Sequence, residues 1–201
     1  MGMIVRPARP EDEDAVVALL YESATGMYDL YAGTAARAHR VLHAAFRASG
    51  NSASAEVVTV AEADGKIVAA MAAFPAAAIE RRARSFLAKT LRHSPPWTWP
   101  ASIRVFRLGG RVSPAPPIDS FYVDALATTP AFRRRGAALA LLTAAQELAF
   151  QAGEHSLALE TALDNHAAQS LYEGFGFRVF DERAPSRGLP GFVGYVKDLA
   201  G

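Results

Sequence analysis

Three consecutive arginines, Arg133 to Arg135, run directly into Gly136 and then into an alanine- and leucine-rich stretch with the pattern of a helix. The first amides of a helix have no partner within it, and the helix dipole adds partial positive charge at the same end. Small residues at Gly136 and Ala138 would let an anionic group approach these amides closely. The stretch therefore predicts an anion site for a phosphate-bearing ligand, although it lacks the lysine and hydroxyl of a P-loop.

Other polar residues stand where they could do chemistry or could simply be structural. Asp124 lies in the apolar run from Phe121 to Leu126, and an unpaired buried carboxylate is costly, so it must have a partner or border a cleft. Strict alternation would place Asp124 on the same face of its strand as Tyr122 and Leu126. Asn165 could cap a helix, and Tyr172, near the end of that helix, could be an ordinary packing residue.

The arginine stretch resembles a motif of a known family. Arg133-x-x-Gly136-x-Ala138 lies between a strand pattern and a helix pattern. It is similar to the Arg/Gln-x-x-Gly-x-Gly/Ala signature of the GNAT superfamily of acyl-CoA-dependent N-acyltransferases. Small residues at the second and third positions fit the close approach of a phosphate.

A second motif follows downstream in the order that the family has. The run from Leu159 to Asn165, then Leu171-Tyr172 and Gly174-Phe175-Gly176-Phe177, is similar to the later GNAT motif, in which an Asn opens a helix and a Tyr nears its end. The resemblance covers most of the chain and leaves out residues 75–117. Two motifs in the right order indicate the family more strongly than either one alone.

The resemblance implies a V-shaped opening between the strands at residues 121–127 and 156–161, with acetyl-CoA as co-substrate. The pantetheine arm would pair along the first strand at Leu126 and Ala127, and the pyrophosphate would lie on the turn amides. The residues implied in cofactor binding are Leu126, Ala127, Arg133, Arg134, Arg135, Gly136, Ala137, Ala138, Asn165 and Tyr172. The implied reaction is direct transfer of an acetyl group to a primary amine of a small molecule or peptide, without a metal.

The resemblance also assigns the catalytic roles. Tyr172 matches the family's tyrosine, which protonates the leaving thiolate as general acid. For the general base, which takes a proton from the ammonium substrate, Glu160 is the first candidate and Asp124 the second, and an ordered water is a further alternative. A non-catalytic acyl-CoA sensor of the same fold is the alternative function, and a nucleic-acid module using the arginines is the other rival.

Hydrophobic periodicity and turn signals predict the elements that would position these residues. The expected strands cover residues 3–6, 57–61, 67–71, 119–127, 156–161, 177–181 and 192–199, and the expected helices cover 11–23, 34–48, 80–92, 136–151 and 164–173. Asp64-Gly65 predicts a tight hairpin. With the resemblance, the fold class is α/β (α+β): one GNAT-like domain over residues 1–201, with a mixed, mostly antiparallel sheet of about seven strands, flanked by helices and splayed between the fourth and fifth strands.

Residues 75–117 interrupt this rhythm, and we call them the insertion segment. After the basic helical stretch at 80–92 they hold the proline- and tryptophan-rich run 94–100, a further helix pattern and a proline-rich exit. They would either form a lid over the site or be a surface elaboration in which Trp97 and Trp99 pack only within the segment itself. Together with Phe106, these tryptophans favour an apolar or aromatic acceptor amine. Asp29 and Glu80 are candidates for contacting its positive charge.

Composition limits the class of protein, the compartment and the partners that we expect. Apolar residues make up 51% and charged residues 20%, as in a globular domain, and the formal net charge is only +1. A chain with no cysteine and no signal-peptide or membrane-span pattern is expected in the cytoplasm. The expected partners are acetyl-CoA and an amine, with no nucleic acid and no membrane, and a homodimer is left open. The histidines show no metal-ligand spacing.

Overall fold

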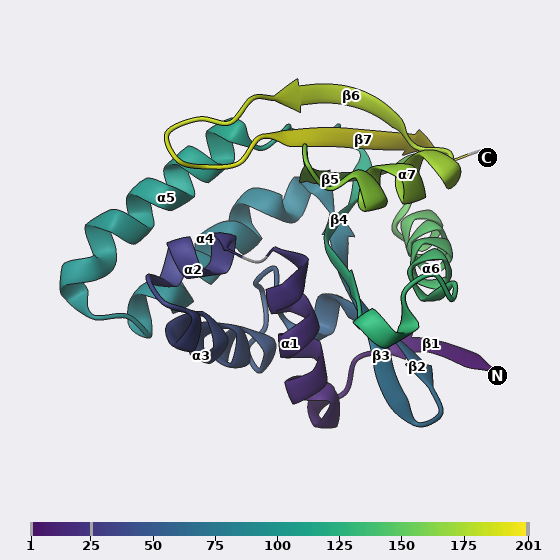
Figure 1. Ribbon diagram of the computed structural model, residues 1–201, viewed down its shortest axis with the longest axis horizontal. Helices are drawn as coiled ribbons and strands as arrows, with labels where there is room; N and C mark the ends of the chain where they lie inside the picture. Colours follow the sequence, from purple (N-terminus) through teal and green to yellow (C-terminus); the bar gives the residue numbers. More distant parts are fainter. Residues whose placement is uncertain (1, 25, 200–201) are drawn as a thin grey trace.

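The computed structural model describes residues 2–24 and 26–199 (Figure 1). The strands are β1 (Met3–Pro7), β2 (Val58–Ala63), β3 (Lys66–Pro75), β4 (Ser120–Thr128), β5 (Ser156–Ala162), β6 (Arg178–Arg183) and β7 (Phe192–Asp198). The helices are α1 (Glu13–Ser23), α2 (Met27–Ala32), α3 (Ala35–Phe46), α4 (Ile79–Arg92), α5 (Trp99–Val112), α6 (Ala137–Ala152) and α7 (His166–Gly174). In the part of the chain thus described, no helix is both long and apolar enough to cross a bilayer.

The seven strands form one sheet in the order β1-β2-β3-β4-β5-β7-β6. All neighbouring strands are antiparallel except β4 and β5, which run parallel. These two strands pair only from Ser120↔Ser156 to Val123↔Leu159, after which each continues without the other. We call this divergence the fork. The expected mixed, mostly antiparallel and splayed sheet is confirmed.

Helices cover both faces of the sheet (Figure 1). On one face, Leu141 and Leu142 of α6 pack in a core that includes Met71 and Val123. On the other face, α1 and α3 pack in a core that includes Ala125. Leu141 and Leu142 are four and five residues after Ala137, so the helical period turns one apolar stripe of α6 toward the strands.

The hairpin between β2 and β3 has the turn that its sequence predicts. Ala63 pairs with Lys66, so the loop is Asp64-Gly65 alone. Both loop residues have positive φ, 52° and 73°, as a type I′ turn requires. The prediction from Asp-Gly is confirmed.

Helix α2 is the element that the periodicity missed. It has six residues and lies between Gly26 and Gly33, both of which have positive φ. Six residues complete fewer than two turns, so no apolar stripe is long enough to recognise. This short helix turns out to border the candidate site.

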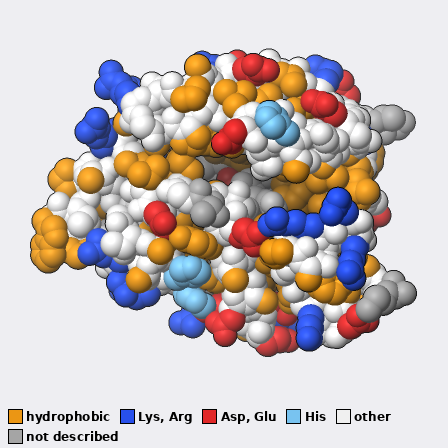
Figure 2. Space-filling model, in the orientation of Figure 1, with side chains coloured by type: hydrophobic (Ala, Val, Ile, Leu, Met, Phe, Trp, Pro, Cys, Tyr) orange, Lys and Arg blue, Asp and Glu red, His pale blue; other side chains and the backbone are white. Residues whose placement is uncertain are grey.

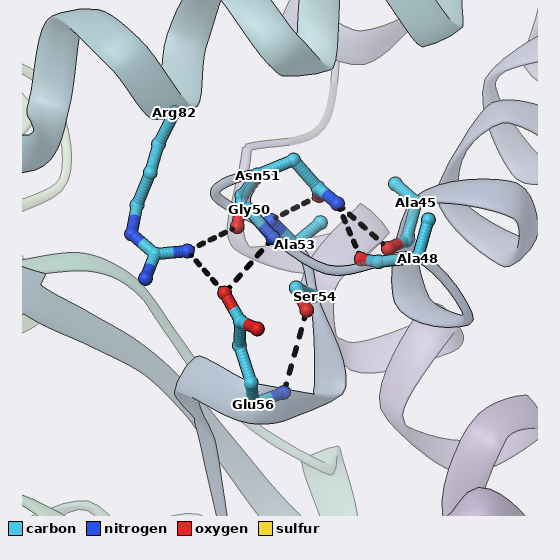
Figure 3. Close-up of polar contacts among 8 residues, drawn as sticks. All are labelled: Ala45, Ala48, Gly50, Asn51, Ala53, Ser54, Glu56 and Arg82. Atoms are coloured by element: carbon cyan, nitrogen blue, oxygen red, sulfur yellow. Dashed lines mark hydrogen bonds and ion pairs between the residues drawn. The ribbon is translucent and has the colours of Figure 1, made fainter.

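The insertion segment is largely helical and is fixed to the rest of the molecule. Its first helix, α4, sends Arg82 to the loop after α3, where the guanidinium donates to the Asn51 carbonyl at 3.0 Å and to Glu56 at 2.8 Å (Figure 3). The side chain of fully buried Asn51 donates to the carbonyls of Ala45 and Ala48 at 2.9 and 2.7 Å. This network ties α4 to the end of α3.

Candidate active site

A cleft of ≈ 690 Å³ lies between the end of β4, the start of α6 and helix α7. Its lining residues come from three stretches of the sequence, within residues 22–23, 126–139 and 165–172. The predicted cofactor residues that line it are Leu126, Ala127, Arg133, Arg134, Gly136, Ala137, Ala138, Asn165 and Tyr172. Figure 2 shows a central hollow in this face of the molecule and, beside it, an apolar surface bordered by basic side chains.

The floor of the cleft at α6 is main chain. Helix α6 begins at Ala137 with no side-chain cap, and its first intrahelical bond runs from the Ala140 amide to the Gly136 carbonyl at 2.9 Å. Gly136 has φ 85°, and Arg134, although not a glycine, has φ 58°. A Cβ on Gly136 would meet nothing within 4 Å, so this position faces open space. Uncapped amides and left-handed residues of this kind form a concave anion site.

The three arginines have different surroundings. Arg133 forms an ion pair with Glu22 at the end of α1, and its Nε donates to the Thr128 carbonyl at 3.4 Å. Arg135 stacks its guanidinium over the Phe132 ring, 5.3 Å from the ring centroid. Arg134 lines the cleft. Arg133 and Arg134 thus both line the cleft, and the Arg133 guanidinium also holds the turn to α1.

Helix α7 supplies two polar side chains to the opposite wall. Asn165 caps the helix by accepting from the Ala168 amide at 3.2 Å, and it donates to the Thr161 hydroxyl at 3.2 Å. Tyr172 is 6% exposed and packs against the rings of Phe177 and Tyr195. Burial raises the pKa of Tyr172 to about 12, and the nearby Tyr195 adds to the shift. The phenol therefore keeps its proton at neutral pH and can donate it.

A β-bulge places Asp124. The register of β4 against β3 runs from Ala125↔Ala72 directly to Val123↔Ala73, so Asp124 is the extra residue. The expectation that Tyr122, Asp124 and Leu126 share one face is wrong. The bulge shifts the alternation by one residue, so that Leu126 packs in the α6 core while Tyr122 packs in a separate cluster with Phe74.

The two predicted base candidates lie together at the fork. Val123↔Leu159 is the last pair between β4 and β5, and Asp124 and Glu160 are the next residue on each strand. The charge of Asp124 contributes to raising the pKa of Glu160. The fold therefore collects both carboxylates at one point, next to the strand that carries the cleft residues Leu126 and Ala127.

Both carboxyl groups exchange protons near neutrality. Burial is the main cause that raises the pKa of Glu160 to about 7, while a hydrogen bond from the Ser113 hydroxyl to Oε2 opposes the rise. Asp124 reaches solvent, yet the protein around it raises its pKa to about 7 as well, against the lowering effect of Arg82. We call the surroundings of Asp124 and Glu160 at the fork the recess. A carboxylate with such a raised pKa can accept a proton from an ammonium ion at neutral pH.

Sequence reasoning missed four hydroxyl groups around this recess. Tyr122 is buried on β4, and its pKa is raised well above the usual value by burial and by the charges of Glu160 and Asp124. Burial and the same carboxylates raise the pKa of Tyr31 on α2, and burial and Asp124 raise that of Tyr28. Ser113 comes from the end of α5. The i, i+3 spacing of Tyr28 and Tyr31 was the available signal, but α2 was not predicted.

The residues expected to contact the acceptor's charge have other partners. Asp29 accepts from the Tyr21 hydroxyl at 2.9 Å, and Glu80 pairs with Arg84 along α4. Trp97 is 81% exposed at the turn between α4 and α5, and Trp99 donates to backbone carbonyls of Leu91 and Ser94. Of the aromatic residues predicted in the insertion segment, Phe106 is the one that stacks on a residue of the recess, Tyr31.

Comparison with known proteins identifies the family. A family model described as the acetyltransferase (GNAT) family matches residues 20–177. The chain belongs to the GNAT acetyltransferase family. No curated protein sequence matches the chain.

Solved structures share the GNAT fold at low sequence identity. An N-acetyltransferase from Staphylococcus aureus Mu50 is 19% identical, with a TM-score of 0.75 over 96% of this chain and 100% of its own. A structure described as an acetyltransferase is 20% identical, with a TM-score of 0.69 over 98% and 100%. A mosquito arylalkylamine N-acetyltransferase like 5b is 17% identical, with a TM-score of 0.60 over 98% and 100%. At such identities these structures show the fold.

Membership in the GNAT family gives the cleft a ligand class. The family uses acetyl-CoA, and one structural neighbour, the NatC complex, was solved with CoA bound. The uncapped turn at Gly136 suits a phosphate-bearing ligand, and the β4 edge beyond Val123 has no strand partner on the β5 side among the described residues. The donor set therefore fits a long, phosphorylated cofactor arm.

Proposed function

We propose that this GNAT protein transfers an acetyl group from acetyl-CoA directly to a primary amine. The observation that carries the proposal is the fork. It leaves the edge of β4 open beside the amide-lined turn, and it exposes Glu160 and Asp124 at the point where the strands part.

The pantetheine arm would extend along β4 at Leu126 and Ala127, with its pyrophosphate on the amides from Arg134 to Ala138. Main-chain N–H groups on the free edge of β4 would bind the thioester oxygen as negative charge develops there. This arrangement would bring the thioester toward Asp124, because Asp124 precedes Leu126 by only two residues. The acetyl group would thus lie at the boundary between the cleft and the recess.

The chemistry then removes two protons from the nitrogen and adds one to the sulfur. Glu160 takes a proton from the ammonium group, with Asp124 as second candidate, and the free amine attacks the thioester carbonyl carbon. The new N–C bond forms as the C–S bond breaks, and Tyr172 donates its proton to the departing thiolate. The nitrogen, now bonded to the acetyl carbon, loses its second proton, and this proton returns to the Tyr172 phenolate through solvent. The position of Tyr172 in the lining of the cleft supports this role.

The direct test measures thiol release from acetyl-CoA in the presence of a panel of primary amines, with the acetylated amine identified by mass spectrometry. We expect thiol release that depends on the amine and matches product formation. CoA binding without amine-dependent thiol release would instead favour the sensor function.

A Tyr172→Phe variant tests the acid. Removal of one hydroxyl leaves the ring contacts with Phe177 and Tyr195 in place. We expect kcat to fall by about 100-fold, the lower end of general-acid contributions, with the dissociation constant for CoA unchanged. Tyr195→Phe is the matched control, since its hydroxyl donates to Glu173 at 3.1 Å. Full activity of Tyr172→Phe would exclude Tyr172 as the acid.

A further inference from the structure

We propose that the insertion segment forms one wall of the acceptor site, and that this site takes a cationic primary amine with an aromatic or apolar body and no carboxylate. The inference rests on the proposed function and names the acceptor class of that same site. It is carried by contacts between the insertion segment and the recess at the fork.

The first contact reaches a base candidate. The Ser113 hydroxyl, just after α5, donates to Oε2 of Glu160, so one oxygen of this carboxylate is held by the insertion segment. The next residue, Pro114, is buried and lies against β7, where a Cβ on Gly194 would come within 2.7 Å of it. The segment therefore crosses from the fork to the C-terminal strands at this point.

The second contact is aromatic. Phe106 of α5 stacks on Tyr31 of α2, with ring centroids 4.2 Å apart and planes 23° apart. Gly109 lies one turn further along α5 and has no side chain. A Cβ at this position would lie 3.0 Å from the Tyr31 hydroxyl oxygen. Phe86 of α4 extends the group, because its ring contacts both Phe106 and Tyr28. The partly exposed Tyr28 and Tyr31 of α2 are thus backed by rings of α4 and α5, and we infer that together they form an aromatic wall beside the recess.

This wall is anchored at more than one place. Arg82 of α4 holds the insertion segment to Asn51 and Glu56 (Figure 3), and the Arg82 guanidinium also lies over the Phe74 ring, 5.1 Å from its centroid. The positive charge of Arg82 also lowers the pKa of Asp124, against the effect of burial. With anchors at α4 and at Ser113, the wall is a fixed part of the site rather than a free lid.

The charges of the recess select the head group. When ionised, Asp124 and Glu160 attract an ammonium ion and repel a carboxylate, because like charges repel strongly in a partly desolvated site. The partly exposed rings of Tyr28 and Tyr31 offer apolar surface and π faces beside the carboxylates. An amine with an aromatic body satisfies both features, whereas the corresponding amino acid brings an unfavourable negative charge.

The test uses a matched pair, phenethylamine and phenylalanine, which differ by one carboxylate. We expect kcat/KM for phenethylamine to exceed that for phenylalanine by roughly 100-fold, from about 3 kcal/mol of repulsion. A peptide with a free N-terminal phenylalanine is the third arm. Equal rates for the pair, or a preference for the amino acid or the peptide, would overturn the inference.

Variants separate the wall from general damage. Gly109→Ala places a methyl group against the Tyr31 hydroxyl and should lower kcat/KM for phenethylamine at least about 10-fold, with an unchanged dissociation constant for CoA. Trp97→Ala, at an exposed site on the same insertion segment, should leave both values unchanged. Unchanged amine kinetics in a folded Gly109→Ala variant would contradict the wall.

Binding distinguishes failure of this inference from failure of the proposed function. Calorimetry of the CoA-loaded protein should show phenethylamine binding that is weaker in Gly109→Ala and absent for phenylalanine. If this binding pattern appears but no amine is acetylated, the proposed function fails while the acceptor class stands. If acetylation occurs with other amines while phenethylamine neither binds nor reacts, the acceptor class fails alone.

Discussion

The proposed cofactor side and the proposed acceptor side of the fork are built by different means. On the cofactor side, the turn at Gly136 and the free edge of β4 offer main-chain groups, and most lining side chains are small or apolar. On the acceptor side, Glu160, Asp124, Tyr31 and Ser113 come from four separate elements and act through their side chains. A ligand shared by a family can be bound by backbone geometry, whereas an individual acceptor has to be selected by side chains.

Glu160→Gln should produce the largest effect and should be confined to the acceptor side. Loss of the general base is expected to lower kcat by about 10²–10⁴-fold while CoA binding stays as in the parent. Steady-state kinetics and calorimetry measure the two quantities, and Glu62→Gln is the control at a distant carboxylate that pairs with Arg6. A loss of CoA affinity in Glu160→Gln would erase the distinction between the two sides.

The acidic limb of the pH profile of kcat/KM tests the role of Glu160 on the acceptor side. With a pKa of about 7, Glu160 is mostly protonated below neutrality, so kcat/KM should rise with pH through about 7. The groups that face Glu160 are Ser113, Asp124, Tyr31 and Tyr122, and the coupled carboxylates share this titration. Ser113→Ala removes a hydrogen bond to the ionised form, so it should move the limb to higher pH. An unmoved limb would exclude Ser113 as a positioning residue.

Gly136→Val should weaken acetyl-CoA binding on the proposed cofactor side. A β-branched residue at φ 85° is strained by about 1–2 kcal/mol, and its methyl groups would fill the space where a phosphate approaches. We expect the KM for acetyl-CoA to rise at least about 10-fold, measured by kinetics, with helix content unchanged by circular dichroism. Gly153→Val, with φ 75° at the other end of α6, is the matched control for strain without blockage. Equal KM values in the two variants would argue against the phosphate site.

Folding stability should also report the desolvation of Glu160. Its folded pKa of about 7 exceeds the ordinary value of 4.5, so between these values the folded protein holds a proton that the unfolded chain has released. The contribution of Glu160 to stability is therefore greatest below pH 4.5 and falls as pH rises to about 7. Relative to the parent, Glu160→Gln should gain about 1–3 kcal/mol across this window and no more above it, as measured by urea unfolding. A constant difference at all pH values would contradict the raised pKa.

The smallest expected effect separates two arginines. Arg134 lines the cleft, whereas Arg135 stacks on Phe132. Arg134→Ala should raise the KM for acetyl-CoA by about 2- to 5-fold, because an exposed charge pair contributes about 1 kcal/mol or less. Arg135→Ala should change it less. Equal effects, together with salt-sensitive retention on heparin, would instead favour a general basic patch.

The sequence by itself determined much of the fold, because turns and helical periods depend on residues that are close together in the chain. Asp64-Gly65 specifies its turn through positive φ, and the apolar periods of α3 and α6 exceed two turns. Most of the proposed cofactor residues lie in two continuous motifs, Arg133 to Ala138 and Asn165 to Tyr172, and most of them line one cleft. Helix α2 was not predicted, because six residues carry too little periodicity.

Tertiary structure alone decided the acceptor side. Nothing near Asp124 in the sequence predicts the bulge that reverses its expected alternation, because a bulge depends on the register of β3 against β4. The meeting of Asp124 with Glu160 depends on a parallel pairing that stops at Val123. Ser113 and Glu160 are separated by 47 residues, and Tyr31 is further still from both. Long-range packing sets such contacts, whereas a backbone turn is set by its own residues.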